Sequence, residues 1–322
     1  MLAIQATRAG GPDVLEPVEI EAPRAGPGEV LVRHQAIGLN FIDTYQRSGL
    51  YPMRFPAVLG QEGTGVVESV GEGVARFAAG DRVAYCGVAG AYAELHAVAA
   101  DRVLALPAAV SAETAAASLL KGMTAEFLLR RCHALRAGET ILVHAAAGGV
   151  GALLVQWAKA IGARVIGAVG SDEKATLARR LGCDEVILYR QEDVAARVRE
   201  ITQGAGVQVA YDSVGKDTFE GTLASIARRG LFVSFGNASG PAPAVEPLRL
   251  TRAGSIFITR PTLFDYTATR VELEESAGAF FAMLASGKVR VEIGQRFRLA
   301  QARAAHEALE SRATTGASVL LP

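Results

Sequence analysis

Short segments with alternating apolar and polar residues dominate the chain from residue 1 to about residue 120. The segment EVLVRHQAIGLN alternates and then stops at a turn, and GTGVVESVGEGV, GDRVAYCG and AYAELHAV follow the same pattern. Turn-forming residues recur between these segments. Several short strands with regular turns predict a small β-rich body.

A different pattern begins at Ser111. SAETAAASLLKGMTAEFLLRR predicts a helix that Ser111 caps. From Glu139 onward, buried apolar runs alternate with amphipathic segments, and glycines close two of the predicted helices, at Gly162 and Gly182. Strands separated by helices of this length predict crossover units on a parallel sheet. The expected strands are ETILVHAA, RVIGAVG, EVILY, VQVAYDSV, LFVSFG and GSIFITRP, and the expected helices are GGVGALLVQWAKAIG, DEKATLARRLG, DVAARVREITQG, DTFEGTLASIARRG, ELEESAGAFFAMLASGKV and QARAAHEALESR.

Composition narrows the class of protein. Half of the 322 residues are apolar, a fifth are charged, and the formal net charge is zero. A neutral chain argues against nucleic acid or an anionic membrane as the main partner, because both favour a basic surface. The uncharged run 141–158 approaches the length of a membrane span, but its glycines and His144 fit a strand, a turn and a helix start better. Three widely spaced cysteines offer no disulfide framework, so we expect a cytoplasmic protein.

The strongest chemical signal is HAAAGGVG, residues 144–151, between a predicted strand and a predicted helix. Glycines in this position let the backbone approach a pyrophosphate, and the free N–H groups of the helix start face the anion. The spacing departs from G-x-G-x-x-G, since Ala146 or Ala147 replaces the first glycine. A tight strand-to-helix turn is the alternative, but the position at the start of a βαβ series favours dinucleotide binding.

The end of the second strand of this series distinguishes NAD from NADP. An NAD site usually has an acidic residue there, about 20 residues after the glycines, for the ribose 2′-hydroxyl. Here the strand ends in Gly170 and Ser171, and Lys174 follows. A hydroxyl and a cation suit a 2′-phosphate, so we expect NADPH. In the alternative interpretation Ser171 only caps a helix and Lys174 is a solvated helix residue.

Several segments together resemble the medium-chain dehydrogenase/reductase superfamily, and within it the zinc-free bacterial NADPH:quinone oxidoreductases related to zeta-crystallin. They are GQEGTGVVESVGEGV, AAGDRVAY, LLKGMTAEFLL, HAAAGGVG and ESRATTGASVLLP. The resemblance implies an α/β protein with a GroES-like β-rich catalytic domain, residues 1–121 and 262–322. A Rossmann domain with a doubly wound parallel sheet, residues 122–261, would bind NADPH. It also implies a homodimer, often paired through the edge of the Rossmann sheet.

The zinc-binding members of the superfamily provide a contrast. Where they carry a zinc-binding His in GHExxG, this sequence has Gln61. No cysteine stands near Asn40 and Asp43, and only Cys86 appears between Gly80 and Ser111, where those members have a four-cysteine lobe. Zinc needs three or four N or S ligands within reach. We therefore expect no metal site.

The resemblance places Asn40, Phe41, Tyr45 and Thr124 beside the nicotinamide, and Tyr51 where related enoyl reductases have a proton-donating tyrosine. Ordinary alternatives are a turn residue for Asn40, a half-buried aromatic for Tyr45 and a loop-packing tyrosine for Tyr51. The expected catalytic residues are Asn40, Tyr45, Tyr51 and Thr124, and the rest of the expected cofactor set is Ala147, Gly148, Gly149, Val150, Ser171, Lys174, Tyr189, Ser213, Phe235, Gly236 and Arg312. For Tyr189 the alternative is a strand-end aromatic, and for Arg312 a solvated cation.

A hydride acceptor that needs no metal should already be activated, as a quinone is. The expected activity is NADPH-dependent reduction of quinones. Reduction of α,β-unsaturated carbonyls or enoyl thioesters is the enzymatic alternative. A nucleotide-bound protein with little turnover, as some crystallin relatives are, is the alternative from another class.

Overall fold

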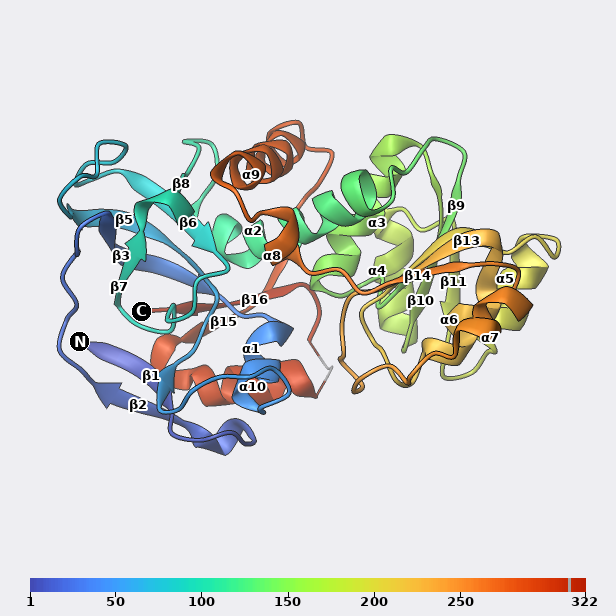
Figure 1. The fold of residues 1–322 in the computed structure, drawn as a ribbon, viewed down its shortest axis with the longest axis horizontal. Helices are drawn as coiled ribbons and strands as arrows, with labels where there is room; N and C mark the ends of the chain where they lie inside the picture. Colours follow the sequence, from blue (N-terminus) through green and yellow to red (C-terminus); the bar gives the residue numbers. More distant parts are fainter. Residues whose placement is uncertain (312–313) are drawn as a thin grey trace. The chain divides into compact units, whose positions relative to one another are not determined.

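The computed structural model describes residues 1–311 and 314–322, and the chain divides into two compact units. Unit 1 comprises Met1–Met123, Thr267–Ala285 and Val291–Pro322, and unit 2 comprises Thr124–Tyr266 and Ser286–Arg290. The last part of the chain therefore returns to the unit that the N-terminal part builds (Figure 1).

Unit 1 is built from two sheets of mainly antiparallel strands. The larger sheet has the order β15-β16-β3-β5-β6-β8, with β7 also paired to β3, and the smaller has the order β2-β1-β4. Strand β3 alternates as predicted, since Val30 and Val32 are fully buried while Arg33 is exposed. The strands are β1 Leu2–Ala6, β2 Leu15–Glu19, β3 Glu29–Gly38, β4 Ala57–Val58, β5 Glu62–Val70, β6 Arg82–Cys86, β7 Leu95–Ala99, β8 Leu104–Ala105, β15 Ile293–Arg298 and β16 Ala317–Leu321.

Helices close the ends of these sheets. Residues Leu299, Ala302 and Ala305 of the C-terminal part join the main core of unit 1. The helices are α1 Phe41–Arg47, α9 Arg270–Ala285 and α10 Ala302–Glu310, with short 3₁₀ turns η1 Pro12–Val14, η2 Ala100–Arg102 and η4 Leu299–Gln301. Helix α2, Ala112–Phe127, begins in unit 1 and ends in unit 2. Ser111 caps it as predicted, because its Oγ accepts the Thr114 N–H at 3.0 Å.

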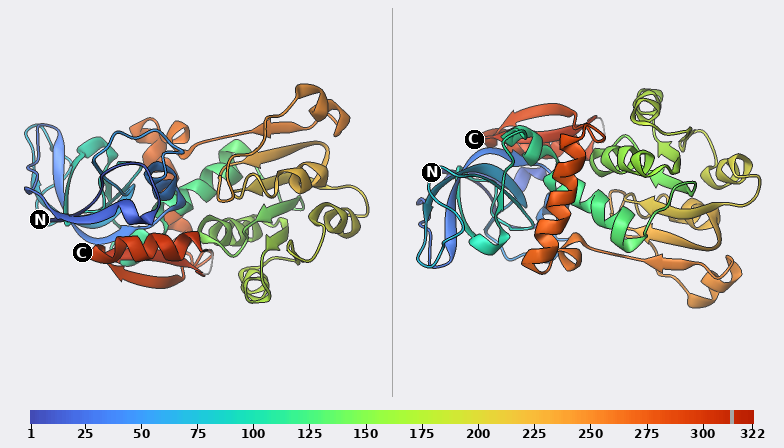
Figure 2. Two further views of the ribbon diagram at one scale, coloured as in Figure 1. Left: turned by 90° about the horizontal axis from the view of Figure 1, so that it is seen from below. Right: turned by 90° about the horizontal axis from the view of Figure 1, so that it is seen from above.

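Unit 2 contains a parallel sheet of order β11-β10-β9-β12-β13-β14, the expected doubly wound arrangement. Helices flank the sheet (Figure 2), and Gly162 and Gly182 end α3 and α4 in the left-handed conformation at φ 98° and 112°. The strands are β9 Thr140–His144, β10 Arg164–Val169, β11 Glu185–Leu188, β12 Val207–Asp212, β13 Ile226–Ser234 and β14 Phe257–Thr259. The helices are η3 Leu128–Cys132 (a π-helical turn), α3 Gly149–Ile161, α4 Asp172–Leu181, α5 Val194–Ile201, α6 Phe219–Ser225, α7 Pro247–Arg252 and α8 Leu263–Tyr266.

One predicted element is wrong in its extent. The expected helix over residues 217–230 ends at Ser225, and residues from Ile226 onward form the first half of β13. Ile226 is buried and pairs with Val207 of β12, so burial against the sheet prevails over helical periodicity. Arg229 has φ 62°, a left-handed backbone conformation that interrupts the strand register.

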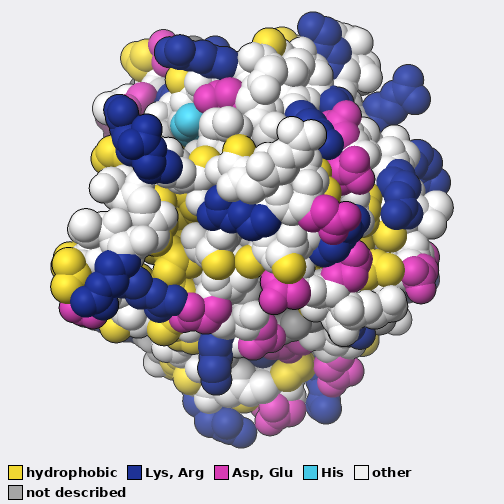
Figure 3. Space-filling model, turned by 90° about the vertical axis from the view of Figure 1, so that its right-hand side faces the viewer, with side chains coloured by type: hydrophobic (Ala, Val, Ile, Leu, Met, Phe, Trp, Pro, Cys, Tyr) yellow, Lys and Arg dark blue, Asp and Glu magenta, His cyan; other side chains and the backbone are white. Residues whose placement is uncertain are grey.

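The surface carries both signs of charge. On the face shown in Figure 3, basic and acidic side chains are interspersed, with small apolar areas between them. Among the described residues, no helix is both long and apolar enough to cross a membrane. The run 141–158 is instead strand β9, a turn and most of α3, as expected.

Candidate active site

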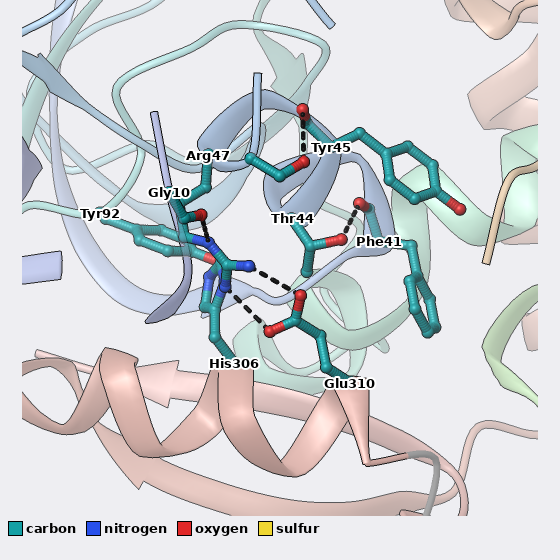
Figure 4. A network of polar contacts seen from close by, with 9 residues as sticks. Gly10, Phe41, Thr44, Tyr45, Arg47, Tyr92, His306 and Glu310 are labelled. Atoms are coloured by element: carbon teal, nitrogen blue, oxygen red, sulfur yellow. Dashed lines mark hydrogen bonds and ion pairs between the residues drawn. The ribbon is translucent and has the colours of Figure 1, made fainter. Parts of the chain in front are cut away.

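Helix α1 presents two aromatic rings on one side. Phe41 and Tyr45 are one helical turn apart, and their ring centroids lie 6.2 Å from one another. Tyr51, in the following loop, meets Tyr45 edge-on at 5.3 Å, and its N–H donates to the Tyr45 carbonyl at 3.0 Å. In Figure 4 the rings of Phe41 and Tyr45 point away from the buried side chains of the same helix. The structure thus brings together three of the aromatic residues expected at the site.

The opposite side of α1 is charged and buried. Asp43 is fully buried and Arg47 is 2% exposed, the reverse of an ordinary surface helix. Arg47 binds Glu310 of α10 with two hydrogen bonds of 2.7 and 3.1 Å, and its Nε donates to the Gly10 carbonyl at 3.1 Å (Figure 4). The helix is therefore held by its polar face, which leaves its aromatic face available for another role.

A chain of hydrogen bonds continues from Arg47 through His306 to Asp43. Arg47 Nη1 can only donate, so His306 Nδ1, 3.0 Å away, accepts. His306 then carries its proton on Nε2 and donates to the Tyr92 hydroxyl at 3.0 Å, and Tyr92 donates to Asp43 Oδ2 at 3.0 Å. Burial lowers the pKa of His306 to about 3, which keeps the ring neutral in this chain.

Asn40 caps α1 and connects it to a second buried carboxylate. Its N–H donates to Asp43 Oδ2 at 2.8 Å, and its side-chain Nδ2 donates to Glu62 Oε2 at 2.9 Å. Glu62 is fully buried, and Lys121 of α2 lies 3.9 Å away. Gly38 leaves room for this carboxylate, because a Cβ there would stand 2.3 Å from Glu62 Oε2.

Burial perturbs the charges of this group. It raises the pKa of Asp43 to about 7 and raises the pKa of Glu62, and it lowers the pKa of Lys121. Within the described residues, Asp43 Oδ1 and Lys121 Nζ are buried without a hydrogen-bond partner. Two carboxylates and one ammonium thus share an apolar interior directly beneath Asn40.

In unit 2, the glycine loop has the geometry of a nucleotide cradle. Ala145 is left-handed at φ 50°, Gly148 caps α3, and a Cβ on Gly151 would stand 2.2 Å from the Ala145 carbonyl oxygen. Ala147 lies in this loop, and Gly149 and Val150 form the first turn of α3. The close turn leaves N–H groups of the α3 start without helical partners, which suits a pyrophosphate.

The end of β10 lies beside the end of β11. A Cβ on Gly170 would stand 2.6 Å from the Tyr189 hydroxyl and 3.4 Å from Arg190 Nε. Ser171 caps α4, accepting the Lys174 N–H at 3.4 Å, so the helix-cap interpretation of Ser171 is correct. A cap of this kind also leaves a helix start that favours phosphate. Ser171, Lys174 and Tyr189 thus gather at one edge of the sheet.

Two further expected residues meet at the ends of β12 and β13. Gly236 packs so closely that a Cβ would stand 2.3 Å from the Ser213 carbonyl oxygen, and the Phe235 N–H donates to the Asp212 carbonyl at 2.8 Å. The Asp212 carboxylate binds Thr218, Thr222 and two backbone N–H groups. This network fixes the backbone on which Ser213 stands.

The remaining expected residues lie elsewhere. Thr124 is 9% exposed and belongs to unit 2, and Arg312 lies outside the described residues. The sequence interpretation missed the buried charged group around Asn40. A local signal existed only in part, as the Asn40–Asp43 capping spacing and as Lys121 within an apolar helix.

The position expected to lack a zinc ligand is occupied by an amide pair. Gln61 Nε2 donates to Gln46 Oε1 at 2.9 Å. Among residues 1–311 and 314–322, no three His, Cys, Asp or Glu side chains are grouped as metal ligands.

Comparison with known families places this geometry in context. Residues 26–108 match the model of the alcohol dehydrogenase GroES-like domain, and residues 149–278 match that of the zinc-binding dehydrogenase. Together the two matches define the class of the chain, a medium-chain dehydrogenase/reductase.

The relatives are more specific. A quinone oxidoreductase of Pseudomonas aeruginosa is 54% identical, with 99% of each chain covered. The crystal structure of Escherichia coli quinone oxidoreductase complexed with NADPH superposes with a TM-score of 0.98 at 48% identity, covering 100% of both chains. A 2-haloacrylate reductase of Burkholderia is 42% identical, covering 98% of this chain and 97% of its own length. The chain belongs to the quinone oxidoreductase family of that superfamily, which confirms the resemblance and the fold class predicted from the sequence.

Proposed function

We propose that the protein reduces quinones with NADPH and without zinc. Full-length similarity to quinone oxidoreductases is the observation that carries this proposal. The aromatic face of α1 supports it, because a quinone is flat and apolar and packs well against aromatic rings.

The residues of unit 2 fit a dinucleotide phosphate. The loop residues Ala147, Gly148, Gly149 and Val150 would hold the pyrophosphate at the start of α3. Ser171, Lys174 and Tyr189 would hold the 2′-phosphate, while Ser213, Phe235, Gly236 and Arg312 would line the rest of the cofactor. When bound, NADPH supplies the hydride for the reaction.

The protein's own residues would orient the acceptor and deliver one proton. We assign Asn40, Phe41, Tyr45 and Thr124 to the nicotinamide and acceptor site. Hydride transfer to the quinone leaves an oxygen that takes one proton, from the Tyr51 hydroxyl or from water. Because water can serve, we assign most of the rate enhancement to alignment of the reactants.

Reduction of an activated carbon–carbon double bond is the second candidate. The 2-haloacrylate reductase relative favours it, since that protein is named for such an acceptor. A panel of quinones, enones and 2-haloacrylate, assayed with NADPH and with NADH, tests both candidates. Quinone turnover at least tenfold above enone turnover supports the first, and the reverse ratio supports the second.

We further propose a cytoplasmic homodimer with residues 1–121 and 262–322 as the catalytic domain and residues 122–261 as the NADPH domain. Strand β14 is the edge of the parallel sheet, and its Phe257 is 63% exposed. An exposed apolar edge strand is suited to pairing with a second copy. The three cysteines are free, which suits a reducing compartment. Light scattering of wild-type protein and Phe257→Lys tests the dimer, since the charge should shift the mass toward the monomer.

A further inference from the structure

The carboxylate of Glu62 is the centre of the buried group beneath Asn40. Its Oε2 accepts a hydrogen bond from Asn40 Nδ2 at 2.9 Å, and its Oε1 accepts the Leu120 N–H at 2.7 Å. Lys121 Nζ stands 3.9 Å from Oε2. Glu62 is 0% and Lys121 7% exposed, so water contributes little to solvating either charge.

An ion pair buried in this way is poor evidence for stability. Apolar residues of similar volume often stabilise a fold as well as a buried ion pair or better, because desolvating two charges is costly. The pair therefore needs another explanation. Its one side-chain hydrogen bond outside the pair goes to Asn40, the residue that the proposed function places beside the nicotinamide.

We propose that Glu62 and Lys121 are positioning residues that fix the orientation of the Asn40 side-chain amide at the acceptor site. Glu62 holds the Nδ2 end of the amide inward, and Lys121 keeps Glu62 in the ionised form that accepts. This inference rests on the proposed function, because it gives a catalytic meaning to the orientation of Asn40.

Replacement of Glu62 by glutamine tests the orientation directly. Both carboxylate oxygens accept, whereas a glutamine has one accepting oxygen and one donating NH₂. The Leu120 N–H is fixed by helix α2 and takes the oxygen, so the NH₂ would face Asn40 Nδ2. Two donors cannot bond to each other, and the Asn40 amide must turn over to offer its oxygen.

Asparagine labelling makes this change observable without an activity assay. The chain contains two asparagines, Asn40 and Asn237, so ¹⁵N-asparagine labelling yields two side-chain NH₂ pairs. Asn237→Ser assigns them. In wild-type protein, one Asn40 NH₂ proton bound to a buried carboxylate should be shifted downfield and protected from exchange. In Glu62→Gln, the Asn40 pair should move while that of Asn237 stays in place.

Turnover provides the functional readout. Glu62→Gln should lower kcat about tenfold to a hundredfold, the cost of a misplaced polar group, and leave the Kd of NADPH unchanged. Lys121→Met leaves both hydrogen bonds of Glu62 in place and should lower kcat less. It serves as the second variant if Glu62→Gln folds poorly. Glu94→Gln is the matched control, because Glu94 accepts the Leu2 N–H at 2.8 Å in the same unit and has no printed bond to Asn40.

The outcomes separate this inference from the proposed function. Moved Asn40 signals and a selective loss of kcat support the positioning role. Unmoved Asn40 signals, or unchanged kcat in both variants, overturn it even if wild-type protein reduces quinones. Absence of quinone and enone turnover in wild-type protein overturns the proposed function, and in that case moved NMR signals still establish the hydrogen-bond arrangement.

Discussion

Arg47 Nη2 of helix α1 lies 2.7 Å from Glu310 Oε1 of helix α10, although 263 residues separate the two in sequence. The pair joins the helix that carries Phe41 and Tyr45 to the last helix of the chain (Figure 4). Arg47 is 2% exposed, so loss of its partner would leave an uncompensated charge in the interior.

Removing Glu310 should therefore destabilise unit 1. We expect Glu310→Ala to lower the free energy of unfolding by about 2–3 kcal/mol, below the full cost of breaking a buried pair because Glu310 is partly exposed. Denaturant unfolding measures this loss. Glu307→Ala, on the same helix but in an exposed pair with Arg303, should cost less than about 0.5 kcal/mol. Equal losses in both variants would contradict the prediction.

Three of the five histidines should remain neutral well below pH 6.5. Burial lowers the pKa of His34 and of His96 to about 4, and that of His306 to about 3. His34 should carry its proton on Nδ1, which lies 2.6 Å from the Ala93 carbonyl, and His306 on Nε2. A ¹⁵N NMR titration of the imidazole rings shows both tautomers, and protonation of any of the three near pH 6.5 would refute this prediction.

Stability should consequently fall in acid. The unfolded chain binds protons at these histidines near pH 6.5 and the folded chain only near pH 4 or below, so folding is favoured above pH 6.5 and less favoured as the pH falls toward 4. Asp43, with its pKa raised to about 7, acts in the opposite direction over this range. Each proton contributes about 1.4 kcal/mol per pH unit, and three histidines outweigh one aspartate. Urea unfolding between pH 7 and pH 4 should show a falling midpoint.

The sequence predicted the large elements because each had a strong local pattern. The strands of the parallel sheet are continuous apolar runs, and glycines mark the ends of α3 and α4. Helix α1 was missed as an element, since its seven residues are too few to show a period and its charged side faces inward. The binding of Arg47 to Glu310 and of Glu62 to Lys121 joins distant segments, which local spacing cannot indicate.

The family model that matches residues 149–278 is named for zinc, so metal content deserves a direct measurement. Gln61 bonds to Gln46 where zinc-binding relatives have a histidine, which leaves no ligand of that type there. We expect less than stoichiometric zinc by elemental analysis and full activity after dialysis against a chelator. One tightly bound zinc per chain would refute the zinc-free mechanism.

Lys174 should distinguish NADPH from NADH. Its backbone N–H caps α4 through Ser171, an interaction that Lys174→Ala retains, so the variant removes only the side-chain charge. A charge-assisted hydrogen bond contributes about 1.5–3 kcal/mol, which predicts NADPH binding weaker by about one to two decades and nearly unchanged NADH binding. Fluorescence titration measures both constants. Arg179→Ala, in the last turn of the same helix, is the control and should change neither.

Tyr51 tests how the reduced acceptor obtains its proton. The ring packs edge-on against Tyr45 at 5.3 Å, a contact that phenylalanine retains, so Tyr51→Phe removes the hydroxyl with little change in packing. Water can protonate the oxygen of a reduced quinone, and kcat for quinones should therefore fall only about tenfold, equivalent to about 1.4 kcal/mol in the barrier. Enone reduction should fall further, since a carbon atom needs a positioned donor. Steady-state assays with a quinone and an enone, at saturating NADPH, give the two ratios. Abolished quinone turnover with intact NADPH binding would show that Tyr51 is an obligatory donor, and unchanged rates for both acceptors would show that it only packs against Tyr45.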